Sequence, residues 1–317
     1  MTPWTATLSD PQHALISFFL LVAAFALVAG VVRTFATRGE VGVRYRTATT
    51  ARSAILVVAA LTYVVLVINF ERGYDLVGVL WVPNAHAVSA FAPRYMEWAV
   101  TVPLLVIELL AVTALTGVRL RHVRTVVVAA TFLMVFAGYL GAFVVGADSS
   151  PAVSLLVWGA VSAVFWVAAT AILIGSVRAS VAMLTPESAR ILGNATVVLL
   201  SGWVVYPAVY VIQIFGDGGA WATVAQVALC SADVAVKLSF GGLTHRVAKL
   251  RTAEDVRAGE DVHPEAIWIS SVKIADAGAA REVNLDAGHT IHRRRPQQAD
   301  ATAVASPILP EESADFD

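Results

Sequence analysis

The sequence predicts an all-α membrane protein, a bundle of seven transmembrane helices. The chain has 317 residues, of which 58% are hydrophobic and only 14% charged, and its mean hydropathy is +0.73. A soluble domain usually carries about 25% charged residues. Apolar runs of roughly 18–25 residues, the length of a helix that spans a bilayer, recur seven times. Such runs are too long for the strands of a membrane β-barrel.

Each apolar run is expected to form one membrane helix. The N-terminus lacks the basic segment of a cleaved signal peptide, so the first run is expected to remain in the mature chain. Polar segments separate the runs, and their alternation of charge, described next, supports a count of seven. In chain order the runs cover 13–33, 53–70, 95–118, 123–146, 151–174, 191–215 and 221–245.

Arginine and lysine gather in alternate connections, and the opposite connections carry mostly acids. The positive-inside rule therefore predicts a multi-pass protein of the plasma membrane with its N-terminus outside and its C-terminus in the cytoplasm. The basic residues are Arg33, Arg38, Arg44, Arg46, Arg52, Arg119, Arg121, Arg124, Arg178, Arg190, Arg246, Lys249 and Arg251. The acidic residues are Asp10, Glu71, Asp75, Asp148 and Asp217.

The chain divides into a seven-helix membrane domain, residues 1–251, and a polar tail, residues 252–317. The tail contains 6 Lys+Arg and 13 Asp+Glu, a net charge of −7. Low hydrophobicity with net charge predicts a largely disordered, cytoplasmic tail. The more apolar stretch 266–274 has two interpretations: a docking segment for a cytoplasmic partner or the membrane surface, or an ordinary part of that tail.

Several classes of site are not indicated. The single cysteine, Cys230, excludes an intramolecular disulfide. The 7 histidines show no metal-ligand spacing, and there is neither a nucleophile–His–Asp set nor a Gly-rich phosphate loop. We therefore expect no enzyme, no metal site and no nucleic-acid partner. The expected partners are the lipid bilayer, further copies of the chain and a cytoplasmic signalling protein that binds the tail.

The seventh run contains Lys237, a lysine in a segment where a free ammonium is unfavourable. A lysine within a membrane helix marks a candidate functional site, and Asp233, one turn earlier, is its natural partner. On these two residues alone, a purely structural Asp–Lys pair remains an alternative.

The third run carries two carboxylates, which must face the bundle interior or water. At 100° per residue, Thr101 lies about 40° and Glu108 about 20° around the helix from Glu97, with Arg94 about 60° away. Glu108 is roughly 16 Å along the axis from Glu97. Together with Lys237, these residues form a line of ionisable groups through the bundle, the arrangement of a proton relay.

Motifs on three helices resemble those of the microbial (type-1) rhodopsins. Residues 94–105 read Arg-Tyr-x-Glu-Trp-x-x-Thr-x-Pro-Leu-Leu, and Glu108 follows. Residues 203–207 read Trp-x-x-Tyr-Pro, and residues 233–241 read Asp-x-x-x-Lys-x-x-Phe-Gly. The resemblance covers all seven runs, about residues 10–250, and the first motif is most similar to the proteorhodopsin subgroup.

This resemblance implies a bound all-trans retinal, attached covalently to Lys237 as a protonated Schiff base. Glu97 and Asp233 would be its counterions, and Arg94 would lie on their outward side. Leu105 matches a position whose leucine accompanies green absorption in proteorhodopsins. The residues implied to surround the retinal are Trp98, Leu105, Trp203, Tyr206, Pro207 and Tyr210.

Two positions depart from the outward proton pumps of the family. Their primary proton acceptor is usually aspartate, whereas this chain has Glu97, which is one methylene longer and keeps the capacity to accept a proton. Arg52 stands where pumps usually have a small neutral residue. If Tyr63 lies near the Schiff base, Arg52 is roughly 16 Å toward the cytoplasm, the depth expected for Glu108. Arg52 could cap the second helix among the headgroups or pair with Glu108.

A pair between Arg52 and Glu108 would change the expected function. A proton donor must hold its proton in the dark, whereas a cation within about 4–6 Å favours the ionised carboxylate. Reprotonation of the Schiff base would then be slow, which suits a sensor better than a fast pump. A buried arginine on the cytoplasmic side resembles the cryorhodopsins, a subgroup from cold-living bacteria.

The lead interpretation is a slow-cycling photosensor or photoswitch that signals through its tail or a small partner. The alternative is a light-driven outward proton pump with Glu108 as proton donor. Chloride pumps neutralise the position of Glu97, and sodium pumps place glutamine at the position of Glu108, so both are disfavoured. A seven-helix receptor without retinal would leave the Lys237 pattern unexplained.

Overall fold

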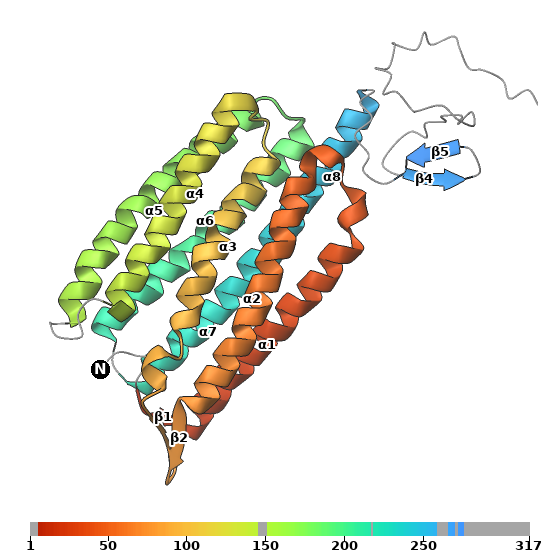
Figure 1. Cartoon of the computed structure of the whole chain (residues 1–317). Helices are drawn as coiled ribbons and strands as arrows, with labels where there is room; N and C mark the ends of the chain where they lie inside the picture. The colour runs from red at the N-terminus through yellow and green to blue at the C-terminus, as the bar shows by residue number, and fades with distance from the viewer. Residues whose placement is uncertain (1–5, 145–150, 217, 259–265, 270–271, 276–317) are drawn as a thin grey trace, which may run out of the picture.

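The computed structural model describes residues 6–144, 151–216, 218–258, 266–269 and 272–275, and within them it has the predicted bundle of seven transmembrane helices (Figure 1). The first six are α1 (Asp10–Ala36), α2 (Arg46–Arg72), α3 (Ala92–Ala111), α4 (Gly117–Tyr139), α5 (Pro151–Val181) and α6 (Pro186–Phe215). The seventh is continuous but changes type: α7 (Gly219–Ala235), the π-helical turn η6 (Val236–Phe240) and α8 (Gly241–Arg257).

Consecutive helices pack against one another, and α7 returns to pack against α1, so the bundle closes into a ring. Large apolar side chains cover its outer surface: on α1, Phe18, Phe25 and Val32 are 58%, 70% and 65% exposed. These residues are seven apart and share one face of the helix. An exposed apolar surface of this kind fits the interior of a bilayer, so the chain is a multi-pass membrane protein.

Six of the described helices are long and apolar enough to cross a membrane by composition alone. The remaining transmembrane helix, α3, carries Arg94, Glu97 and Glu108, and all three are buried. The charges that lower the hydropathy of α3 therefore face the bundle interior, as the spacing predicted.

The connection between α3 and α4 lies earlier in the chain than expected. The sequence suggested helices over 95–118 and 123–146, but α3 ends at Ala111 and α4 already begins at Gly117. The backbone N–H of Val112 bonds back to the carbonyls of Leu109 and Leu110, which closes the last turn. Gly117 has φ +62°, a conformation that glycine adopts without strain. The arginines once expected in the connection, Arg119, Arg121 and Arg124, lie in the first turns of α4.

A small antiparallel sheet closes the end of the bundle at which α1 begins (Figure 1). It comprises β1 (Leu8–Ser9), β3 (Leu80–Pro83) and β2 (Tyr74–Val77) in that order. A two-residue turn joins β2 to β3, and its first residue, Gly78, has φ +64°, as the twist of a tight hairpin requires. The shorter helical segments of the bundle are η2 (Arg38–Glu40), η3 (Val43–Tyr45), η4 (Ala87–Ser89) and η5 (Leu140–Val144).

At the opposite end, the last turns of α8 are tied to two other helices. Arg251 is buried and donates through Nη1 to the carbonyls of Val112 (3.0 Å) and Thr113 (2.6 Å), beyond the end of α3. Glu254 accepts hydrogen bonds from Thr185 (2.5 Å) and Ser188 (2.8 Å), where α6 begins. These contacts hold the C-terminal end of the membrane domain in place.

The membrane domain was expected to end at residue 251, but its last helix, α8, continues to Arg257. Within the stretch 266–274 singled out in the sequence, β4 (Ala266–Ile269) and β5 (Val272–Ala275) form an antiparallel hairpin. The expectation of disorder for the rest of the tail falls mostly on residues outside the described part of the chain.

Candidate functional site

The centre of the bundle is occupied by Lys237, which is 3% exposed. Its Nζ lies 2.7 Å from Oδ1 of Asp233 and 3.2 Å from Oε1 of Glu97. Lys237 lies in the π-helical turn η6, a distortion often found at functional sites. The buried ammonium thus has two carboxylates within contact distance, one from its own helix and one from α3.

Asp233 accepts hydrogen bonds from three further side chains. Tyr206 donates to its Oδ1 at 2.7 Å and Trp98 at 3.3 Å, whereas Tyr63 donates to Oδ2 at 2.8 Å. These donors come from α6, α3 and α2, so the carboxylate joins four helices. From the sequence, Tyr63 was used only to estimate how deep Arg52 lies in the membrane. Its contact with Asp233 was not predicted, because the two residues are 170 positions apart and meet only through the arrangement of the helices.

Arg94 balances the charge of the cluster from the side nearer the three-stranded sheet. Its Nη1 donates to the hydroxyl of Tyr63 at 2.9 Å and lies 3.5 Å from Oδ2 of Asp233. Its Nη2 donates to Oε1 of Gln226 at 3.1 Å and contacts the sulfur of Cys230 at 3.8 Å. Two cations and two carboxylates therefore share one buried cluster, which is how buried charges are tolerated.

Glu97 has fewer partners than Asp233. Thr101, one turn further along α3, donates to its Oε1 at 2.6 Å. Its other oxygen, Oε2, is buried and accepts no hydrogen bond from the part of the chain that the structure describes. The two carboxylates beside Lys237 thus differ: one is saturated with donors, and the other keeps a free oxygen.

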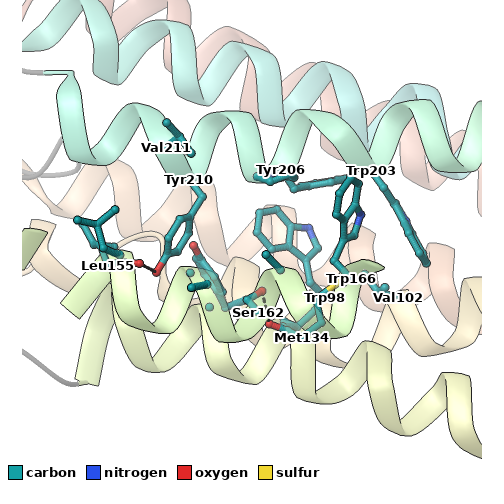
Figure 2. Close-up of a pocket in the computed structure, with 18 of the residues that line it drawn as sticks. Trp98, Val102, Met134, Leu155, Ser162, Trp166, Trp203, Tyr206, Tyr210 and Val211 are labelled. Atoms are coloured by element: carbon teal, nitrogen blue, oxygen red, sulfur yellow. Dashed lines mark hydrogen bonds between the residues drawn. The ribbon is translucent and has the colours of Figure 1, made fainter. Parts of the chain in front are cut away.

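An apolar cavity of about 380 Å³ lies between the helices beside this cluster (Figure 2). Trp98 and Tyr206 both line it and both bind Asp233, so its wall includes two residues that contact the carboxylate beside Lys237. The expected residues that line it are Trp98, Trp203, Tyr206, Pro207 and Tyr210. Leu105 is buried in α3 but is not among the lining residues.

Other lining residues were not anticipated in the sequence, because those on α4 and α5 carry no distinctive motif and Tyr95, although part of the motif on α3, was given no role there. They include Tyr95, Met134, Gly138, Gly159, Ser162 and Trp166. A side chain at Gly159 would place its Cβ 2.7 Å from the ring of Tyr210, so the absence of a side chain makes room for that ring. Apolar walls rich in aromatic rings, next to a buried lysine and carboxylates, fit a retinal attached to Lys237.

A second polar cluster lies between this site and the α8 end of the bundle. Glu108 is 1% exposed, and its Oε1 accepts from the hydroxyl of Thr244 at 2.5 Å. Arg52 is 6% exposed and donates through Nη1 to the carbonyl oxygen of Gly241 at 3.0 Å. A Cβ built on Gly241 would lie 2.9 Å from Cδ of Arg52 and 3.7 Å from Oε1 of Glu108.

Both long side chains therefore converge on Gly241, at the similar depth that the sequence suggested. Arg52 is buried, which disagrees with its placement among the headgroups. The other alternative, a direct ion pair with Glu108, is not formed either, because Arg52 donates to a carbonyl and Glu108 accepts from Thr244. Neither Gly241 nor Thr244 was singled out from the sequence as a partner of this pair.

Outside the membrane segments, Glu40 of η2 joins the α1–α2 connection to α8. Its Oε2 lies 2.7 Å from Nζ of Lys249 and 3.1 Å from Nε2 of His245. The hydrogen bond from Lys249 lowers the pKa of Glu40 below its ordinary value of 4.5. This contact is a further tie between α8 and the rest of the bundle, besides those of Arg251 and Glu254.

Comparison with known proteins places this arrangement in a family. A family model described as "Bacteriorhodopsin-like protein" matches residues 14–250. The chain is similar to a green-light absorbing proteorhodopsin of Gamma-proteobacterium EBAC31A08, 26% identical over 236 residues, which are 74% of this chain and 85% of the relative. It is also similar to sensory rhodopsin-2 of Natronomonas pharaonis, 29% identical over 215 residues, 66% of this chain and 80% of the relative.

Among solved structures, a thermophilic rhodopsin superposes with a TM-score of 0.71 at 26% identity, covering 79% of this chain and 98% of the other. The bundle, the buried lysine with its carboxylates and the adjoining aromatic cavity agree with these similarities. The chain belongs to the bacteriorhodopsin-like family of retinal-binding, light-driven membrane proteins.

Proposed function

We propose that this protein is a slow-cycling photosensor or photoswitch that carries all-trans retinal on Lys237 as a protonated Schiff base. The observation that carries the proposal is the burial of Arg52 beside Glu108 at Gly241. Bound retinal supplies the absorption of visible light and the change of shape that drives the proton away from Nζ of Lys237.

Glu97 is the group best arranged to accept that proton. Its Oε1 lies 3.2 Å from Nζ, and its Oε2 has no hydrogen-bond partner among the described residues, so a proton can be added there without breaking a hydrogen bond. Asp233 already accepts from Lys237, Tyr206, Trp98 and Tyr63, and protonation would disturb these contacts. We therefore assign proton acceptance to Glu97 and a fixed counterion role to Asp233.

Return of the proton to Nζ depends on Glu108, which lies on the other side of the lysine along α3. Burial alone favours the protonated form of a carboxyl group, which is what a donor needs. The guanidinium of Arg52, whose side chain lies against the same glycine, Gly241, opposes this, because a nearby positive charge favours the carboxylate. A donor that is partly ionised before light arrives would return the proton slowly, and the activated state would persist.

The residues between Arg94 and the three-stranded sheet also favour a sensor over a pump. Among the described residues, the buried carboxylates are Glu97, Glu108 and Asp233, and none lies beyond Arg94 on that side. Arg94 contacts Gln226 and Cys230 there. An amide does not bind and release protons at neutral pH, so the described residues offer no buried acid on that side to pass a proton outward.

The alternative is an outward proton pump with Glu108 as donor, and one observation favours it. Glu108 is buried and hydrogen-bonded to Thr244, so it has a defined position on the far side of Lys237. One similar relative is named a proteorhodopsin and another a sensory rhodopsin, so similarity does not choose between the two functions.

The proposed topology has the sheet end outside and the end of α8 in the cytoplasm. Arg246, Lys249 and Arg251 lie near that end of α8, as the positive-inside rule requires. The tail would then leave the bundle on the cytoplasmic side and carry the signal to a partner protein. We also propose that the chain assembles with further copies of itself in the membrane.

Flash photolysis of the retinal-reconstituted protein tests the proposal. The expected result is recovery of the visible absorption over seconds to minutes at neutral pH. Recovery in milliseconds would establish Glu108 as an efficient donor and favour the pump.

The Arg52→Met variant tests the cause of the slow recovery. Methionine removes the charge but keeps an unbranched chain, so recovery should become roughly tenfold faster or more, which corresponds to about 1.4 kcal/mol. Arg46→Met, an exposed position on the same helix, is the matched control and should recover like the unaltered protein. An unchanged rate in Arg52→Met would return Arg52 to a structural role.

A further inference from the structure

The guanidinium of Arg52 makes fewer hydrogen bonds than its donors allow. Nη1 donates to the carbonyl oxygen of Gly241, whereas Nε and Nη2 are buried and have no partner among the described residues. These two nitrogens form one edge of the guanidinium, the edge that binds a carboxylate with two parallel hydrogen bonds. A buried arginine with that edge open has room for a carboxylate that is not now bound to it.

Thr244 has more acceptors than its single proton can serve. Its hydroxyl lies 2.5 Å from Oε1 of Glu108, 3.1 Å from the carbonyl of Phe240 and 3.1 Å from the carbonyl of Gly241. When Glu108 is ionised, Thr244 donates to it. When Glu108 is protonated, Glu108 can donate to Thr244, whose own proton then turns to one of the two carbonyls.

We propose that Thr244 is a positioning residue that holds Glu108 away from Arg52, so that Glu108 has two alternative partners. In the first arrangement Glu108 is bound to Thr244 and Arg52 to Gly241. In the second, the ionised Glu108 occupies the open edge of Arg52. The inference rests on the proposed role of Glu108 in returning the proton, and it adds the residue that selects between the two arrangements.

Gly241 makes the exchange possible without a large movement. The position of its missing Cβ is 2.9 Å from Cδ of Arg52 and 3.7 Å from Oε1 of Glu108. The arginine stem and the carboxylate therefore lie on either side of the same small space. A side chain at residue 241 would separate them, and its absence leaves the carboxylate a path to the guanidinium.

The experiment compares Thr244→Val with Thr244→Ser, which restores the hydroxyl. Loss of the hydroxyl should release Glu108 to Arg52 and slow recovery after a flash by roughly two- to tenfold. This is opposite in sign to the effect of Arg52→Met. Thr244→Ser should recover like the unaltered protein, and the double variant Thr244→Val/Arg52→Met should recover as fast as Arg52→Met alone.

Thr196→Val is the matched control, because Thr196 is also buried but bonds only to the carbonyl of Leu192 in its own helix. It should leave the recovery unchanged. An equal slowing in both valine variants would indicate general loosening of the bundle and overturn the proposal. If Thr244→Val yields no pigment, Thr244→Cys, with its weakly bonding thiol, makes the same comparison.

A second readout is the carboxyl band of Glu108 in the light-minus-dark infrared spectrum, assigned by its loss in Glu108→Gln. In Thr244→Val this band should move to higher frequency or disappear, because the carboxyl loses a hydrogen bond or its proton. An unmoved band, or no Glu108 band in the unaltered protein, would overturn the role of Thr244. Millisecond recovery together with a moved band would overturn the sensor function but support the position of Thr244.

Discussion

At the scale of single residues, the site is a balance of buried charges. Lys237 and Arg94 bring two positive charges into the bundle, and Glu97 and Asp233 bring two negative ones. Removing one partner of such a set commonly destabilises a protein by about 3–5 kcal/mol, because it leaves an uncompensated charge. When the counterion roles of Glu97 and Asp233 are tested, each should therefore be replaced by an uncharged group of similar size.

The Glu97→Gln variant should absorb at longer wavelength than the unaltered protein. Loss of one counterion lets the positive charge near Nζ of Lys237 spread further along the bound polyene. Absorption spectra of the two reconstituted proteins measure the shift, with the exposed Glu71→Gln as a matched control and Lys237→Ala as the variant without visible absorption. An unmoved spectrum would make Asp233 the main counterion.

At the scale of helices, spacing along α3 was enough to predict much of the site. A period of 3.6 residues placed Arg94, Glu97, Thr101 and Glu108 on one side, and all four are buried. The end of α3 was predicted less well. The residues that follow it, Val112 to Thr116, are as apolar as those of a membrane helix, and the break is marked only by the backbone conformation of Gly117. The contacts of Arg52 could not be predicted from the sequence, since its partner Gly241 lies 189 positions away. The direction in which Gly241 faces also depends on how the π-helical turn η6 rotates the helix about its axis.

The tie between η2 and α8 gives a prediction about pH. The pKa of Glu40 is lowered by Lys249, so the stabilisation is present above the ordinary value of 4.5 and is lost as the pH falls through the lowered value. Glu40 is partly exposed, so the effect should be below about 1 kcal/mol. Thermal unfolding in detergent should show Glu40→Gln slightly less stable at neutral pH.

The same two proteins should be equally stable at a pH well below 4.5, where Glu40 is protonated in both states of the chain. Lys249→Met, which removes the other partner, should reproduce the neutral-pH loss. A difference between Glu40→Gln and the unaltered protein that stays constant across this pH range would show that the contact is not electrostatic.

At the scale of the whole molecule, the seven-helix bundle was predicted and is confirmed, because long apolar runs have few other ways to satisfy their backbone in lipid. The cavity was predicted only in part. Trp98, Trp203 and Tyr206 belong to recognisable motifs on α3 and α6, whereas Gly159 and Trp166 on α5 become identifiable only when α5 is seen to pack against α6.

The chain shortened after Arg257 should keep its absorption maximum and its recovery time, because the described contacts of both clusters lie before that residue. Spectra and flash photolysis of the shortened protein test this. A chain that ends after Lys249 is the informative comparison, because it lacks Arg251. Without the hydrogen bonds from Arg251 to the carbonyls of Val112 and Thr113, this chain should be clearly less stable. Altered recovery in the first shortened protein would show that the tail acts on the photocycle.

Two of the attachments that hold the end of α8 differ in how readily they break. Arg251 is buried, and its charge-assisted hydrogen bonds beyond the end of α3 are worth about 1.5–3 kcal/mol each. Of the two hydrogen bonds that Glu254 accepts from α6, the one from Thr185 is exposed and correspondingly weaker, whereas the one from Ser188 is partly buried. A force that separates α6 from α8 would break the contact at Glu254 first and leave Arg251 in place. Close to Arg257, α8 is therefore held more firmly to the end of α3 than to the start of α6.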